Sequence, residues 1–234
     1  MTSKTFLKRL KLSKEDFDEI ENAVRKAEEG TSGEIALAAA AESSSYAFYE
    51  LLSSLISGFI LMISLLPLAD QINAWLGRIL WGSQSWHLVA FYIASYALLV
   101  TFLYLLFNIP FLDSLVVPSG AKKQAVSTRA LRYFTESGVY ATSEHSGILI
   151  YVSFFEREVR IIADQGLSEK VGGDLWNLIA DEMKELLAKG KVKEAYLTAI
   201  ERCSVLLKEK FPSDGNNKNE LADGLVILEN EKWQ

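Results

Sequence analysis

Two long uncharged segments constrain the fold of this chain more than any other feature of its sequence. The first lies between Glu50 and Asp70, and the second lies between Arg78 and Asp113. At about 1.5 Å per helical residue, each is long enough to cross a hydrocarbon core of roughly 30 Å. The second contains WHLVAFYIASYALLVTFLYLLFNIP, which is apolar around the whole helix circumference. We therefore predict a transmembrane hairpin at 46–112, with spans at about 48–68 and 86–110. The alternative is an apolar hairpin buried in the core of a water-soluble protein.

Basic residues near the ends of the spans predict how the hairpin is oriented. Four of them follow the second span, whereas the loop between the spans carries only Arg78. The four are Lys122, Lys123, Arg129 and Arg132. Because cytoplasmic segments near a span are enriched in Lys and Arg, we expect the loop outside and the rest of the chain in the cytoplasm. The expected location is the inner (plasma) membrane, as a multi-pass protein with the lipid bilayer as a partner.

The composition argues against nucleic-acid binding and against a fold held together by disulfides. A formal net charge of -6 and an isoelectric point near 5.1 provide no basic field for phosphate backbones, so nucleic acid is not expected as a partner. The single cysteine, Cys203, falls on the apolar face of a predicted helix. This excludes a disulfide framework and favours a buried, unreactive side chain.

Helical and strand patterns alternate on both sides of the hairpin. Short apolar runs at 34–41, 147–155, 159–163 and 225–228 indicate strands, the last of them at an edge of the sheet. Helical spacing is found at 13–29, from Val126 to near Gly138, from a cap at Ser168 to Gly190, and from 192 to Pro212. In the loop of the hairpin, Ile72, Trp75, Leu76, Ile79 and Leu80 also recur at helical spacing.

These patterns predict an α/β layered domain that is interrupted by the hairpin. The run at 147–155 is apolar at both parities, as in a central strand covered on both faces. The sheet needs the strand at 34–41 to be complete. We therefore assign 1–45 and 113–234 to two parts of one domain.

Four separated motifs resemble the TPM domain family. They are AEEGTSGEI at Ala27 to Ile35, GILIYVSFFEREVRIIADQGL at Gly147 to Leu167, Trp176, and FPSDGNNKNELAD at Phe211 to Asp223. The chain looks like the bacterial membrane branch, in which a transmembrane hairpin is inserted in the domain. The resemblance implies an α/β/α sandwich. It implies no single chemistry, because members have been linked to phosphatase activity, to calcium binding and to assembly or repair of membrane complexes.

Five oxygen-bearing residues are the candidate metal ligands. They are Glu34 at the start of its strand, Asp164 at the end of another, and Asn219, Glu220 and Asp223 in a late loop. Hard oxygen donors near strand ends suit calcium or magnesium. The alternative is that Glu34 and Asp164 cap neighbouring helices or turns and that the late loop is solvated. No motif identifies a catalytic residue, and His145 is expected in a polar turn.

Two functions remain open at this point. The first is a binding or assembly module for a membrane-associated partner, which would be a membrane protein. The second is a divalent-metal-assisted phosphatase, which requires Glu34, Asp164 and at least one residue of the loop from Asn219 to Asp223 to converge.

Overall fold

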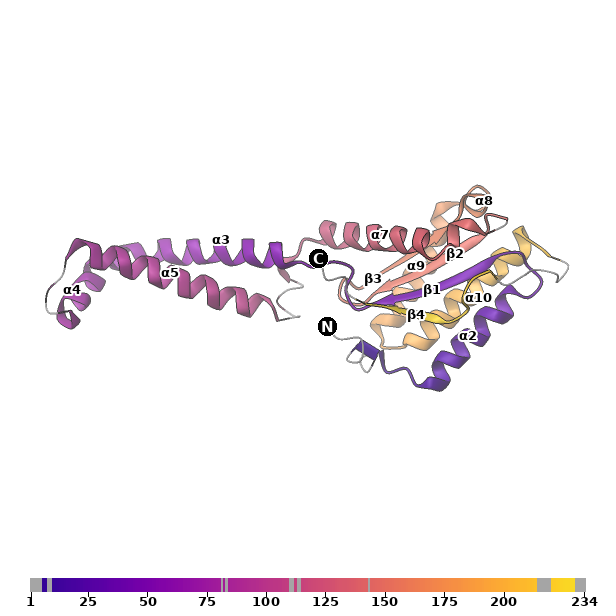
Figure 1. Cartoon of the computed structure of the whole chain (residues 1–234), viewed down its shortest axis with the longest axis horizontal. Helices are drawn as coiled ribbons and strands as arrows, with labels where there is room; N and C mark the ends of the chain where they lie inside the picture. Colours follow the sequence, from indigo (N-terminus) through magenta and orange to yellow (C-terminus); the bar gives the residue numbers. More distant parts are fainter. Residues whose placement is uncertain are drawn as a thin grey trace. The chain divides into compact units, whose positions relative to one another are not determined.

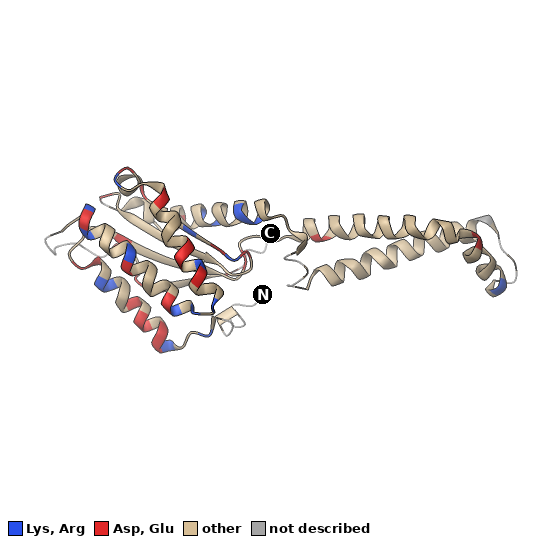
Figure 2. Cartoon of the chain, turned by 180° about the vertical axis from the view of Figure 1, so that it is seen from behind, with Lys and Arg blue, Asp and Glu red and all other residues tan. Residues whose placement is uncertain are grey.

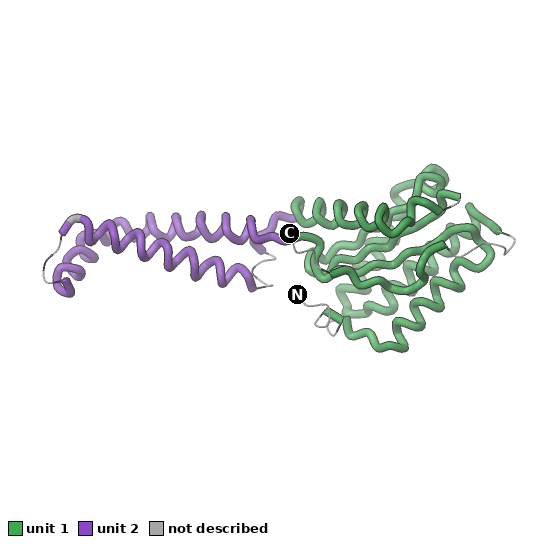
Figure 3. The backbone as a smooth tube through the Cα atoms, in the orientation of Figure 1, with its two compact units in different colours: residues 1–44, 120–234 green, residues 45–119 purple. Residues whose placement is uncertain are grey.

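The computed structural model describes residues 6–7, 10–80, 82, 84–109, 112, 115–142, 144–213 and 220–229. The chain forms two compact units, which Figure 3 shows in different colours. The α/β unit comprises Met1–Ser44 and Gly120–Gln234, and the hairpin unit comprises Ser45–Ser119. The α/β unit is therefore built from chain segments on both sides of the hairpin unit.

A four-stranded mixed sheet is the centre of the α/β unit. Its strands are β1 (Glu34–Ala40), β2 (Gly147–Ser153), β3 (Glu158–Ala163) and β4 (Leu225–Leu228), in the order β3-β2-β1-β4. Strand β1 pairs in parallel with both β2 and β4, and β2 forms an antiparallel hairpin with β3. The strand that precedes the hairpin unit thus occupies a central position, as Figure 1 shows.

Helices cover both faces of this sheet. On one face, α2 (Lys14–Glu28), α9 (Gly173–Ala188) and α10 (Val192–Lys210) pack on the main hydrophobic core, which includes Cys203. On the other face, α7 (Ser119–Glu136) and the nearby Val139 pack on a smaller core. Every residue of β2 is buried, as predicted for a strand covered on both sides. The predicted α/β/α sandwich is confirmed.

Local sequence explains the least typical strand and the first helix. The sequence of β1 is EIALAAA, and alanine has a weak intrinsic preference for strands. Its alanines on the α7 side pack with Val126 and Ala130, so their small side chains give α7 a close approach to the sheet. Helix α2 begins at a reciprocal capping box in which Ser13 and Asp16 satisfy each other's backbone N–H groups.

One predicted helix start is wrong. Ser168 does not cap the long helix; it is the last residue of a single helical turn, α8 (Gln165–Ser168). The carboxylate of Asp164 caps this turn by accepting the Gln165 N–H at 2.7 Å. The long helix α9 begins only after Gly172. Gly172 is the N-cap of α9 and Gly173 its first residue, and glycine is a poor helix former, so the helical pattern is interrupted before this point.

In the part of the hairpin unit that the structure describes, two long helices flank a short one. They are α3 (Ala47–Leu65), α4 (Ala69–Ile79) and α5 (Ser85–Phe107), with a 3-10 turn at Leu66–Leu68. Figure 2 shows that α3 and α5 are almost free of charged residues. Helix α3 buries Glu50, Ser54 and Gly58, which lie on one stripe. The amide of Asn108 donates to Glu50 at 2.9 Å, and a Cβ at Gly58 would lie 2.8 Å from Val100, so α3 and α5 are antiparallel and closely packed.

Few of the apolar side chains of the two long helices are buried. The described residues include two helical segments long and apolar enough to span a membrane, Ala47–Ile79 and Trp86–Phe107, and their most apolar windows are only 11% and 6% buried. Examples are Phe59, Leu98 and Phe102, with exposed fractions of 60%, 73% and 62%. A hairpin forming the core of a soluble protein would bury these groups, so that alternative does not describe the hairpin unit.

We predict that a fragment starting at Lys122 does not fold stably, because it lacks α2 and the central strand β1. Fusing 1–42 to 122–234 through a short flexible linker should restore cooperative unfolding, since the linker replaces only the hairpin unit. Urea unfolding followed by circular dichroism measures both. A fragment that unfolds cooperatively with the stability of the fusion would contradict the two-part α/β unit.

Candidate functional site

Most of the predicted acidic residues lie at one edge of the sheet. Strands β1, β2 and β4 are parallel, and Glu34 is the first residue of β1. The segment that leads into β4, which contains Glu220 and Asp223, reaches the same edge. This amino edge is opposite the carboxyl edge at which α/β domains usually bind their ligands.

The Glu34 side chain is held by backbone groups of the segment before β4. Only 2% of Glu34 is exposed. Its carboxylate accepts the backbone N–H groups of Glu220 and Leu221. Burial raises the pKa of Glu34 above its ordinary value, and these two hydrogen bonds oppose the rise. Glu34 thus fixes the entry to β4 against the start of β1.

An ion pair neutralises the second buried carboxylate. Asp223, which is 8% exposed, accepts from Arg25 Nε at 3.3 Å. Arg25 lies in the last turn of α2 and also contacts Glu21 at 3.1 Å. The guanidinium group of Arg25 is therefore a cation that contacts Asp223 directly.

A third carboxylate completes the cluster and was not predicted from the sequence. Glu28, the last residue of α2, accepts the Ile35 backbone N–H at 2.8 Å. β4 pairs with β1 only from Leu37 onward. At Ile35, the Glu28 carboxylate therefore accepts the N–H in the place that a carbonyl group of β4 would otherwise take. Burial raises the pKa of Glu28 to about 8, and the nearby charges of Glu34 and Asp223 add to the rise.

Asp164 lies across β2 from this cluster. Its backbone N–H donates to Gly147, the residue that pairs with Glu34 in the sheet. Its carboxylate contacts His145 Nδ1 at 3.2 Å and caps α8. His145 has a left-handed φ of 51°, and a Cβ at Gly166 would lie 2.7 Å from its carbonyl oxygen. The alternative that Asp164 caps a helix is therefore correct, and His145 occupies the predicted polar turn.

The predicted ligand set is thus divided. Glu34, Glu220 and Asp223 lie together, Asp164 is directed to His145, and Asn219 lies outside the described residues. The structure adds Glu28 and Arg25, which the sequence analysis did not single out. Among the residues that the structure describes, no three His, Cys, Asp or Glu side chains are arranged to hold a metal ion.

A second buried polar network lies at the carboxyl edge of β1 and β2. The Ser43 hydroxyl contacts the Tyr151 hydroxyl at 2.9 Å and donates to Ser153 at 2.7 Å, and its backbone N–H donates to Glu156 at 2.9 Å. Ser153 also donates to Glu156. Burial raises the pKa of Tyr151 to about 12. The network fastens the end of β1 to the turn between β2 and β3.

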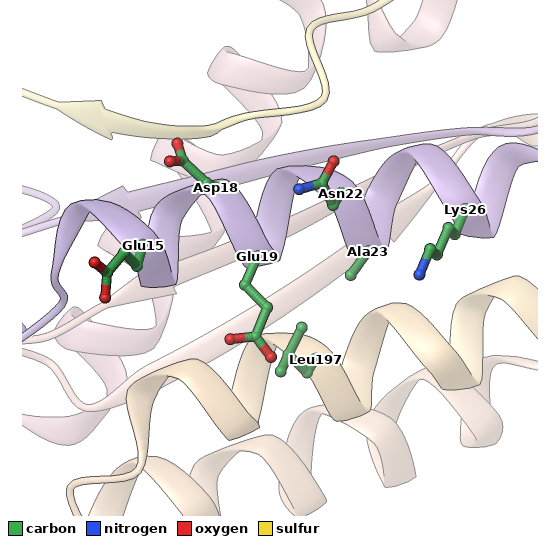
Figure 4. Close-up of a pocket in the computed structure, with 7 residues that line it drawn as sticks. All are labelled: Glu15, Asp18, Glu19, Asn22, Ala23, Lys26 and Leu197. Atoms are coloured by element: carbon green, nitrogen blue, oxygen red, sulfur yellow. The ribbon is translucent and has the colours of Figure 1, made fainter.

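An open groove runs between α2 and α10 on the outside of the α/β unit. Figure 4 shows the seven side chains that line this hollow of about 720 Å³. They are Glu15, Asp18, Glu19, Asn22, Ala23, Lys26 and Leu197. Three carboxylates stand against one ammonium group, so the groove carries a net negative charge.

Together, these features define an α/β/α sandwich domain interrupted by an apolar helical hairpin, with acidic residues gathered at the amino edge of its sheet. Residues 112–205 match the model of the TPM domain family, which confirms the predicted resemblance to that family. The matched range includes β2, β3 and Trp176, whereas the motifs at Ala27 to Ile35 and Phe211 to Asp223 lie outside it. No curated protein matches the chain in sequence.

A solved structure shares the fold. The NMR structure of the BA42 protein from the psychrophilic bacterium Bizionia argentinensis superposes with a TM-score of 0.54, at 18% identity, over 93% of this chain and 95% of that chain. At this level of identity the likeness establishes the arrangement of helices and strands and carries no activity with it.

We predict that Glu28 makes the stability of the α/β unit depend on pH. Its pKa is raised from 4.5 to about 8 on folding, so its contribution is fully present below pH 4.5 and is lost as the pH rises through about 8. Glu28→Gln should flatten this decline by up to about 1.4 kcal/mol per pH unit. Chemical unfolding of the full chain in detergent between pH 5 and 9 measures the slope.

The matched control for this prediction is the next residue. Glu29 is exposed and is the C-cap of α2. Glu29→Gln should leave the pH dependence of the free energy of unfolding as it is in the wild type. Equal slopes for Glu28→Gln and the wild type would show that Glu28 does not carry the dependence.

Proposed function

We propose that this chain is an integral membrane protein whose TPM-like α/β unit acts as a binding or assembly module for a membrane-associated protein. The observation that supports a binding role is that the carboxylates at the amino edge are held by groups of the domain itself. Arg25 pairs with Asp223, backbone N–H groups hold Glu34, and the Ile35 N–H holds Glu28. Groups held in this way join α2, β1 and the entry to β4, so their first role is to stabilise the fold.

The hairpin unit is the proposed membrane anchor. At about 1.5 Å per residue, α3 and α5 are about 28 Å and 34 Å long, close to the thickness of a hydrocarbon core. The basic residues of α7 support a cytoplasmic α/β unit at the inner (plasma) membrane. In this arrangement both segments of the α/β unit lie on the same side of the bilayer.

The orientation predicts which engineered cysteines are accessible from outside the cell. In a Cys203→Ser background, an impermeant thiol reagent applied to intact cells should label Gln71→Cys, in α4, and should not label Lys123→Cys, in α7. Both positions are exposed. The reverse labelling pattern would place the α/β unit outside.

Photocrosslinking tests the binding role. We expect benzoylphenylalanine, placed on the outer face of the α/β unit that contacts the partner, to give a crosslinked protein of defined mass in native membranes. Asn22 on α2 and Thr128 on α7 are exposed positions on opposite faces of the sandwich. A specific partner should crosslink from one position and not from the other, because the sheet separates the two faces.

Two outcomes of the crosslinking would count against a binding module. The absence of any adduct from both positions would leave the α/β unit without a contacting protein. Equal adducts from both positions, with many proteins, would indicate random collision in the membrane.

The second candidate function is a divalent-metal-assisted phosphatase. The matched TPM family has phosphatase in its name. The observation that favours this function is the closeness of Glu28, Glu34 and Asp223. Their oxygen donors suit calcium or magnesium, and their mutual repulsion favours any added cation. Arg25 already supplies a positive charge at Asp223, so a bound cation would compete with its guanidinium group.

Calorimetry of the full chain in detergent separates the two functions. If the amino edge binds calcium or magnesium, Arg25→Gln should tighten binding by several-fold, because it removes the competing charge. Glu34→Gln should weaken it, and Asp181→Asn, on an exposed part of α9, should not. The phosphatase proposal is excluded if neither the wild type nor Arg25→Gln binds either metal at millimolar concentration.

A further inference from the structure

Helix α4 lies between α3 and α5 in the chain, and part of its surface packs against α5. The 3-10 turn at Leu66–Leu68, which contains Pro67, ends α3, and α4 then folds back beside α5, as Figure 1 shows. Leu76 is buried, with 8% of its surface exposed, and the Trp75 ring meets the Phe91 ring edge-on at 6.2 Å. These contacts fix α4 against the first turns of α5.

The packing leaves much of the apolar face of α4 uncovered. Trp75, Ile79 and Leu80 are 52%, 53% and 48% exposed, although they lie on the same face as the buried Leu76. The opposite face is polar, with Asp70, Gln71, Asn73 and Arg78. A short helix with one apolar face, a tryptophan and an arginine is typical of helices that lie in the interface of a bilayer.

We infer that α4 binds the lipid headgroup region of the leaflet farthest from the α/β unit, with Trp75, Ile79 and Leu80 directed into the acyl boundary. This inference rests on the proposed membrane anchoring by α3 and α5. Because α4 joins the far ends of two helices of membrane-spanning length, the chain itself brings α4 to that level. Asp70 and Arg78 keep the polar face in water, since a charged group is costly in the hydrocarbon core.

We expect lipid, rather than a second copy of this chain or another protein, to cover the exposed apolar face of α4. The uncovered face of α4 is continuous in sequence with the exposed apolar surfaces of α3 and α5. Trp86, at the start of α5, is 61% exposed and donates its indole N–H to Gln84 at 2.6 Å. Trp75 and Trp86 thus mark the same end of the hairpin, as expected for amphipathic rings at one headgroup level.

The lipid-bound helix α4 would hold the hairpin at a fixed depth in the bilayer. An interfacial helix resists movement of the hairpin toward the α/β unit, because Asp70 and Arg78 would then enter the hydrocarbon. It also resists movement away from the bilayer, because Trp75, Ile79 and Leu80 would then enter water. The depth of the hairpin is thereby fixed from its far end.

Spin labels on the full chain test this inference in vesicles of phosphatidylcholine and phosphatidylglycerol. Labels are placed in a Cys203→Ser background at Ile79→Cys and at its neighbour Arg78→Cys, which lies on the polar face. Power saturation then compares oxygen, which concentrates in lipid, with a water-soluble nickel complex. We expect the oxygen-to-nickel accessibility ratio at Ile79→Cys to exceed that at Arg78→Cys by several-fold, and Leu80→Cys to resemble Ile79→Cys.

A label at Leu98→Cys, on the exposed surface of α5, distinguishes the two ways of failing. If this label is accessible to oxygen while Ile79→Cys is as accessible to nickel as Arg78→Cys, the hairpin spans the bilayer and the inference about α4 is wrong. If the Leu98→Cys label is itself accessible to nickel, the membrane anchoring fails, and the inference fails with it. Low accessibility of Ile79→Cys to both reagents would indicate a protein in place of lipid.

Discussion

The parallel pairing of β1 with β2 is the interaction on which the rest of the structure depends. Seven residue pairs join a strand before the hairpin unit to a strand after it. With β2 on one side of β1, β4 pairs with the other side of β1. The last residue of α2, Glu28, contacts the start of β1. The network of Ser43, Tyr151, Ser153 and Glu156 closes its carboxyl end. Without β1, the two cores would each lose a layer of packed side chains.

The two ends of this pairing are stabilised by different chemistry. At the carboxyl edge, hydroxyl groups and one carboxylate satisfy each other away from water, which makes that end stiff and specific. At the amino edge, several carboxylates share one guanidinium group and a few backbone donors. Burial raises the pKa of Glu28 to about 8, which reduces the negative charge at this edge near neutral pH. The charge of the amino edge is therefore sensitive to pH.

Sequence patterns predicted the elements whose signal is carried by many neighbouring side chains. The two apolar segments, the doubly buried strand β2 and the amphipathic helix α10 are of this kind. The amino-edge cluster was predicted only in part, because Arg25 and Asp223 are 198 residues apart and no periodicity links them. The start of α9 was misplaced because Ser168 ends the separate turn α8, which Asp164 caps, and α9 begins only after Gly172. Long-range pairs and the division of a helical pattern into two helices depend on tertiary structure.

The position of β1 also has a consequence for how the chain is made. Ser43 and Glu156 are 113 residues apart, so at roughly 10 residues per second the ribosome needs about 10 s to deliver the partner of β1. During that interval the apolar hairpin emerges, and β1 has no native strand to pair with. An alanine-rich strand has a weak tendency to form sheets with other chains while it waits. The composition that makes β1 an unusual central strand thus suits a segment that must remain unpaired while the next 113 residues are made.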